Sequence, residues 1–217
     1  MQDMIGNESS RQGMTAAVER GQTGAYFVHG PWGLGKKSFL ESLVASGERG
    51  LVVESTVDGI RSVKSKLETA PLLEESHDVV ILDCDGMSVP AQDACLKLLE
   101  EPPSETRLWI HASDASGIGR ALLSRRREEF RWAPVGPEEM GSFAASFGDV
   151  DGLLLEIAAG RPGCYASMRP DPRFKMLHDT VLQAMAGSRD PLLEPLPVLL
   201  SELAGDLRRC AATWTLV

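Results

Sequence analysis

The stretch VVILDCDGMSVPAQDACLKLLEEPP, residues 79–103, decides the fold because it joins a buried strand to a compact helix through a short acidic turn. VVILD is continuously apolar up to its final aspartate, as in a strand covered on both faces. Pro90 suits the first turn of the following helix, and Ser88 is a candidate cap. Apolar residues then recur at i, i+3, i+4 and i+7 until a double proline ends the helix; they are Ala91, Ala94, Cys95 and Leu98.

The same alternation continues on either side of this stretch. Short apolar runs predict four more strands, and amphipathic segments predict helices between them, the first capped by Ser9 or Ser10. Strands that alternate with helices indicate an α/β fold, with a five-stranded parallel sheet that helices cover on both faces. The further strands are expected at residues 25–30, 51–54, 107–112 and 129–135, and the helices at 10–21, 36–46, 60–70 and 119–125.

The pattern changes after residue 136, where only helical segments follow. They are EEMGSFAASF, GLLLEIAAG, RFKMLHDTVLQAMAG and LLSELAGDLRRCAATW. We therefore expect an α/β domain at residues 1–136, a small helical lid at 137–170, and C-terminal helices at 171–217.

The bulk composition argues against several classes of protein. No apolar run approaches the roughly 20 residues that cross a bilayer, and MQDMIGNESS does not have the form of a signal peptide. A cytoplasmic location without a membrane partner is therefore expected. The net charge of −9 argues against autonomous nucleic-acid binding. Four scattered cysteines without a C-x-x-C pair argue against zinc and against disulfides.

A glycine loop lies between the first expected strand and the next helix. GPWGLGK (residues 30–36) matches the frame G-x-x-x-x-G-K, in which backbone N–H groups surround phosphate oxygens and the lysine reaches the outer phosphates. The sequence thus predicts a site for ATP or ADP. With the strand-end residues discussed next, the candidate nucleotide contacts are Gly30, Pro31, Gly33, Gly35, Lys36, Lys37, Ser38, Asp83 and Ser113.

The groups that would hold magnesium are incomplete. The residue after Lys36 is normally Ser or Thr, whose hydroxyl ligates the metal, and here it is Lys37. Ser38 lies about 100° further around the helix. Magnesium binding is therefore expected to be poor.

The acidic turn supplies only part of a hydrolytic site. Asp83 ends its strand where P-loop proteins place a magnesium-shell carboxylate. A water-orienting glutamate often follows it, and here the residue is Cys84. Asp85 is a possible substitute, and Ser113 is a candidate sensor of the γ-phosphate. The alternative interpretation is that these aspartates merely solvate a strand end.

Ser124 and three arginines (125–127) follow the short helical segment GRALL. A guanidinium is planar, permanently charged and able to grip phosphate bidentately, which suits a finger that reaches into a neighbour's ATP site. The alternative is a solvated basic helix end that interacts favourably with the helix dipole.

Several motifs in order resemble bacterial clamp-loader subunits, the AAA+ proteins of the DNA polymerase III gamma, tau and delta-prime type. The acidic turn and its helix resemble their D-x-x-x-x-T-x-x-A-A-N-A-L-L-K-x-L-E-E-P-P signature, and LLSRR (122–126) resembles L-x-S-R-C. Further similar segments are MIGNESS (4–10), VDGIRSVKSKLE (57–68) and AAGRPGCYA (158–166). The resemblance implies an AAA+ P-loop domain followed by a lid, over about the first 170 residues.

Within this family the chain looks most like delta-prime, through G-K-K in its loop and the missing glutamate. Gly163 aligns where active members carry a sensor arginine. The resemblance thus implies weak or absent hydrolysis by this chain and a finger made of Ser124 and Arg125. It also implies a hetero-oligomer with gamma/tau-type and delta-type subunits, part of a DNA polymerase holoenzyme, that places a sliding clamp on primed DNA.

Two departures and two alternatives remain open. The relatives' zinc module is absent, and only about 45 residues follow the lid, so the collar region is truncated or naturally short. One alternative function is an active ATPase subunit in which Ser38 and Asp85 replace the missing ligands. The other is a different AAA+ replication or recombination factor, such as a helicase loader.

Overall fold

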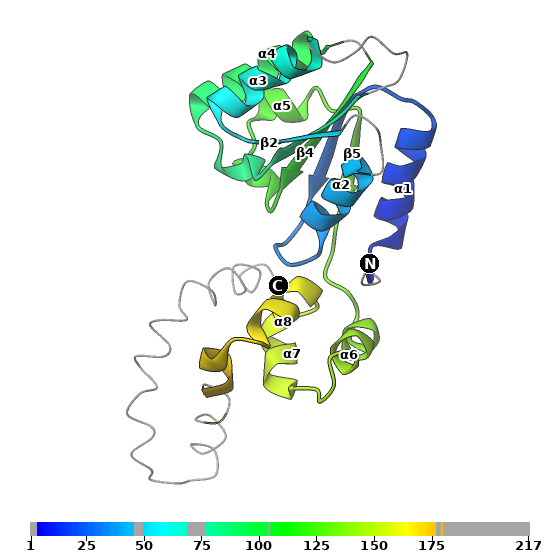
Figure 1. Cartoon of the computed structure of the whole chain (residues 1–217), viewed down its shortest axis with the longest axis vertical. Helices are drawn as coiled ribbons and strands as arrows, with labels where there is room; N and C mark the ends of the chain where they lie inside the picture. The colour runs from blue at the N-terminus through cyan, green and yellow to red at the C-terminus, as the bar shows by residue number, and fades with distance from the viewer. Residues whose placement is uncertain (1–3, 46–49, 69–76, 104, 177–178, 180–217) are drawn as a thin grey trace. The chain divides into compact units, whose positions relative to one another are not determined.

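The computed structural model describes residues 4–45, 50–68, 77–103, 105–176 and 179. It divides into two compact units, which are described separately (Figure 1). Among the described residues, one unit comprises 7–31 and those between 35 and 133, and the other comprises 4–6, 32–34, 134–176 and 179.

The larger unit is built on a five-stranded sheet in the order β2-β3-β4-β1-β5, and every neighbouring pair is parallel. The expected α/β class and strand number are thus confirmed. The last strand is shorter than expected and ends at Arg131. The strands are β1 (Gly24–His29), β2 (Gly50–Glu54), β3 (His77–Leu82), β4 (Thr106–Ala112) and β5 (Glu128–Arg131).

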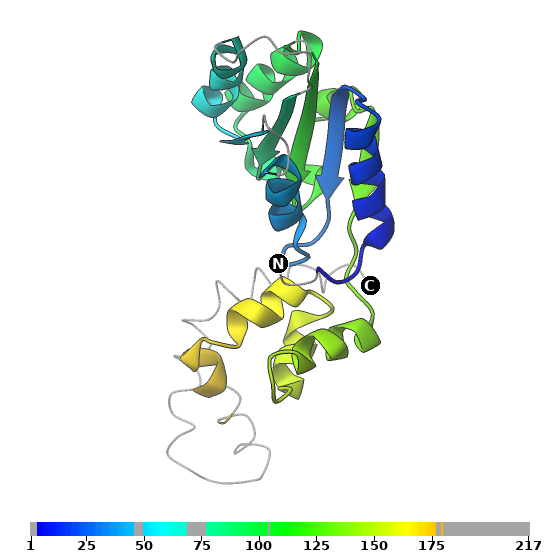
Figure 2. The same cartoon turned by 45° about the vertical axis from the view of Figure 1, so that its right-hand side comes forward.

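Helices cover both faces of this sheet (Figures 1 and 2). One face packs α3 (Val57–Glu68), α4 (Val89–Glu100) and α5 (Arg120–Leu123) into a single aliphatic core. The other face lies under α1 (Glu8–Glu19) and α2 (Lys36–Ala45). A Cβ at Gly50 would meet Val44 of α2, and one at Gly13 of α1 would meet Phe130. Helices on both faces thus account for the continuously apolar sequence of the central strands.

One helix start differs from the prediction. The N-cap expected at Ser9 or Ser10 is wrong, because α1 already begins at Glu8 and its cap residue is Asn7. The Asn7 side chain instead donates to the carbonyl of Ala133 and accepts the Ala133 N–H. These two bonds tie the start of α1 to the segment after β5.

A buried ion pair links β3 to β4. Arg107 donates to both carboxylate oxygens of Asp78, with Nε–Oδ1 and Nη2–Oδ2 distances of 2.8 and 2.7 Å. The indole N–H of Trp109 donates to the same carboxylate. Trp109 also stacks on Tyr26 of β1, with ring centroids 4.7 Å apart. Each charge is therefore paired within the layer under α1 and α2.

The smaller unit contains α6 (Pro137–Ala145), α7 (Gly152–Ala158) and α8 (Pro162–Met168) around an apolar cluster that includes Met140, Leu154 and Tyr165. The helical pattern did not predict α8. Of the two later segments expected to be helical, the first is helical at residues 173–176, and the second lies outside the described residues. None of the helices in the described part of the chain has the length and apolar character needed to cross a bilayer.

Candidate functional site

The glycine loop follows the carboxyl end of β1, where parallel strands commonly place their ligands. Gly30 has a φ of +141°, and a Cβ there would lie 2.1 Å from the carbonyl oxygen of Trp132. Only glycine can therefore occupy this position. Gly35, with a φ of +89°, precedes α2 and faces open space.

The side chain of Lys36 is directed at its own loop. Its Nζ donates to the carbonyls of Gly30 and Pro31, at 2.6 and 2.8 Å, and the residue is only 3% exposed. Burial lowers its pKa to about 8, and the nearby Asp85 and Asp83 partly offset this effect. These two bonds use two of the three N–H donors of the ammonium group.

Lys37, which occupies the position where a hydroxyl side chain normally ligates the metal, is directed into solvent. Lys37 is exposed and lies 4.0 Å from Glu41, one helical turn further along α2. Ser38 is also exposed. An ammonium group cannot ligate a cation, so Lys37 does not fit magnesium.

Asp83, the expected magnesium-shell carboxylate, follows β3 in an unusual backbone conformation. Its backbone is left-handed, with a φ of +56°, and its side chain is 69% exposed. The hydroxyl of Ser55 donates to its carbonyl oxygen. This conformation is rare for residues other than glycine.

The structure also brings Asp85, the possible substitute ligand, next to Ser113. A carboxylate oxygen of Asp85 accepts the backbone N–H of Ser113 at 3.2 Å. Asp85 thus braces the end of β4 through one of its two carboxylate oxygens. A Cβ at Gly117 would also lie close to the Asp85 backbone, so the surrounding turn is tightly packed.

His111 is a member of the site that the sequence analysis missed. Its Nδ1 accepts the backbone N–H of Asp83 at 3.2 Å, and the Asp83 carboxylate lies 3.4 Å away. Burial, assisted by the charge of Lys36, lowers the pKa of His111 to about 4. The imidazole is therefore neutral near pH 7, and Nδ1 serves as an acceptor. Because side chains alternate along a strand, His111 is expected on the same face of the sheet as Trp109, two residues earlier. This signal could have placed it in the sequence analysis.

Cys84 cannot replace the water-orienting glutamate. The residue is buried, its thiol donates to the carbonyl of Ile81, and burial raises its pKa well above the usual value. A neutral thiol in this position does not orient or activate water.

In the smaller unit, the middle of the glycine loop packs against the start of α8. The N–H of Gly163 donates to the carbonyl of Gly33 at 2.7 Å. A Cβ on Gly163 would lie 2.9 Å from that same oxygen. The position aligned with a sensor arginine therefore has no room for any side chain in this arrangement.

The arginine segment lies at the end of α5, where the structure shows each guanidinium held differently. Arg125 donates from Nη1 to the carbonyl of Ala121 and from Nη2 to Glu100, at 2.9 and 2.6 Å. Arg126 pairs with Glu129, and Arg127 donates to the carbonyl of Thr23. The Ser124 hydroxyl caps a carbonyl of its own helix, that of Ala121.

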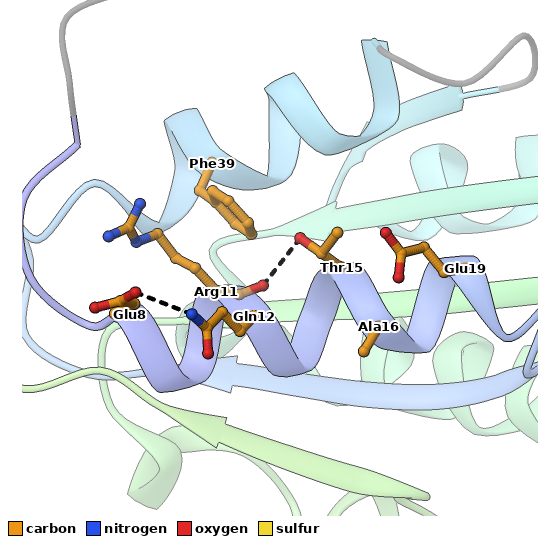
Figure 3. Close-up of a pocket in the computed structure, with 7 residues that line it drawn as sticks. All are labelled: Glu8, Arg11, Gln12, Thr15, Ala16, Glu19 and Phe39. Carbon is orange, nitrogen blue, oxygen red and sulfur yellow. Dashed lines mark hydrogen bonds between the residues drawn. The ribbon is translucent and has the colours of Figure 1, made fainter.

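A surface groove of about 520 Å³ lies between α1 and α2 and has none of the predicted site residues in its wall (Figure 3). Phe39 points toward α1 there, and Gln12 donates to Glu8 across one turn of that helix. The groove mixes both signs of charge and bonds among its own polar groups. We assign no ligand to it.

Comparison with known proteins finds similarity to subunits of replication complexes. A family described as DNA polymerase III, delta subunit, matches residues 42–128. Replication factor C subunit 3 of Blastobotrys adeninivorans is 28% identical over 153 residues, which are 62% of this chain and 43% of that protein. DNA polymerase III subunit delta' of Escherichia coli K12 is 30% identical over 137 residues, 61% of this chain and 40% of that protein. The chain thus spans about two-fifths of the length of these relatives.

Solved structures share the fold. A DNA polymerase III gamma subunit-related protein of Thermotoga maritima has a TM-score of 0.55 at 16% identity, over 79% of this chain and 62% of that one. The Holliday junction branch migration motor RuvB of the same organism has a TM-score of 0.58 at 16% identity, over 93% of this chain and 70% of that one. At this level of identity the likeness shows the fold alone.

Proposed function

We propose, from its motifs and from the replication proteins it resembles, that this chain acts as a delta-prime-like clamp-loader subunit. In this role it supplies Arg125 to the ATP site of an adjacent subunit and hydrolyses little or no ATP itself. Its partners are gamma/tau-type and delta-type subunits, and the assembly loads a sliding clamp onto primed DNA.

The first support for this proposal is the condition of the chain's own nucleotide site. Lys36 is bonded to loop carbonyls, Lys37 stands where a metal hydroxyl is needed, and Cys84 is a buried thiol. The glycines keep the form of a phosphate-binding loop, so ATP or ADP can still be a ligand. The residues that would hold magnesium and activate water do not fit that task.

The observation that carries the proposal is the state of Arg125. Its guanidinium is exposed at the end of a helix and uses two of its five N–H donors, so three have no partner within the described residues. A guanidinium in this state can donate to phosphate oxygens of another protein without first breaking a closed pair.

The test is Arg125→Ala in the loader reassembled with its cognate ATPase subunits. A finger arginine contributes about 10³- to 10⁵-fold to kcat in well-studied NTPases, so we expect the ATPase rate of the complex to fall by at least about tenfold. Arg127→Ala is the matched control: it removes the same charge two residues further along, where the side chain donates to the carbonyl of Thr23. An unchanged rate in the Arg125 variant, with the complex intact by gel filtration, would contradict the proposed function.

A further inference from the structure

Glu100 is the last residue of α4, and its side chain meets Arg125 from a separate element. The Nη2–Oε1 distance is 2.6 Å, and the two side chains are 51% and 39% exposed. The second anchor of Arg125, the carbonyl of Ala121, lies on α5 itself at 2.9 Å from Nη1. The guanidinium is thus fixed at both terminal nitrogens by groups on two helices that pack together.

The same sheet domain contains an arginine pair of a different kind for comparison. The two carboxylate oxygens of Asp78 accept hydrogen bonds from Nε and Nη2 of Arg107, which makes a bidentate ion pair. Glu100 accepts a single bond and leaves Nε–H and one hydrogen on each terminal nitrogen of Arg125 without a partner in the described residues. The Glu100 pair therefore holds the guanidinium while leaving its donors available.

We propose that Glu100 is a positioning residue for the finger: it fixes the guanidinium of Arg125 before the neighbouring ATP site closes on it. This inference rests on the proposed function. An unrestrained arginine side chain samples many rotamers, and docking would have to select one of them. Two anchors make that selection in advance, so removal of Glu100 acts on the transition-state contact rather than on the neighbour's affinity for ATP.

Glu101 offers a matched control on the next residue. Its side chain is 83% exposed and faces Lys64 of α3 at 3.5 Å instead of the arginine segment. Glu101→Ala removes the same charge from the same helix end without touching Arg125. Both glutamates are exposed, so we expect both variants to fold, and circular dichroism is the check.

The experiment measures kcat and KM for ATP in the reassembled loader. We expect Glu100→Ala to lower kcat by about two- to fivefold, the range of an exposed ion pair, with KM unchanged. Glu100→Gln keeps an acceptor oxygen and should recover most of the rate, and Glu101→Ala should match the wild type. Glu100→Ala combined with Arg125→Ala should be no slower than Arg125→Ala alone.

The outcomes separate the two proposals. If Arg125→Ala slows the complex but Glu100→Ala leaves kcat unchanged or raises it, the positioning role is overturned and the finger stands. Equal losses in the Glu100 and Glu101 variants would also overturn it, because the effect would then be one of net charge. If Arg125→Ala has no effect, the proposed function fails and this inference fails with it.

Discussion

His111 shows how a single buried side chain can make the nucleotide-site region sensitive to acid. Its Nδ1 accepts the backbone N–H of Asp83, which holds that residue in its left-handed turn. The acceptor exists only while the ring is neutral. Protonation removes it and places a positive charge beside Lys36, whose charge already disfavours the imidazolium.

The lowered pKa of His111 predicts a specific pH dependence of stability. Its value of about 4 in the folded chain lies below the ordinary 6.5, so the unfolded state binds more protons between these two values. Stability should therefore rise with pH from about 4 to 6.5, by up to about 3 kcal/mol for this group. Urea unfolding at intervals across that range measures the slope. His111→Asn, which keeps an acceptor, should flatten it, and an unaltered slope in this variant would contradict the assignment.

At the scale of elements, α8 contacts the glycine-loop residues of its unit so closely that Gly163 should not tolerate a side chain. A Cβ at Gly163 would lie 2.9 Å from a backbone carbonyl, whereas one at Gly141 in α6 would meet nothing within 4 Å. Gly163→Ala should therefore destabilise the protein by about 1–3 kcal/mol through overpacking. Gly141→Ala should stabilise it by about 0.5–1 kcal/mol, since alanine favours the helix. Denaturant unfolding of both variants checks the pair, and equal effects would refute the packing argument.

The elements were largely predictable from sequence, and the contacts between them were not. The apolar runs at β3 and β4 and the double proline after α4 are local signals, so they place strands and a helix end without tertiary information. By contrast, Glu100 meets Arg125 across 25 residues, and His111 meets Asp83 across 28. Periodicity carries no record of such pairs. The loop bonds of Lys36 were also beyond prediction, because the motif indicates only where the lysine should reach.

At the scale of the whole molecule, the proposed function combines a nucleotide-binding frame with an incomplete metal site. This combination predicts that ATP binding is insensitive to magnesium. Ligands that bind the folded state raise the melting temperature by mass action. Any shift produced by millimolar ATP should therefore be the same with magnesium and with EDTA. A rise that requires the metal and disappears in Lys36→Ala would instead show a working site in which Ser38 or Asp85 serves as a ligand.

The paired charges of β3 and β4 also govern which alignments of these strands can exist. Side chains alternate between faces, so a one-residue slip of β3 would carry Asp78 into the aliphatic layer and leave the guanidinium of Arg107 without its carboxylate. Leaving a buried charge without its partner costs about 3–5 kcal/mol. The Asp78–Arg107 ion pair therefore fixes the register of β3 against β4. The same register places the backbone N–H of Asp83, just after β3, within hydrogen-bonding distance of the imidazole of His111 in β4.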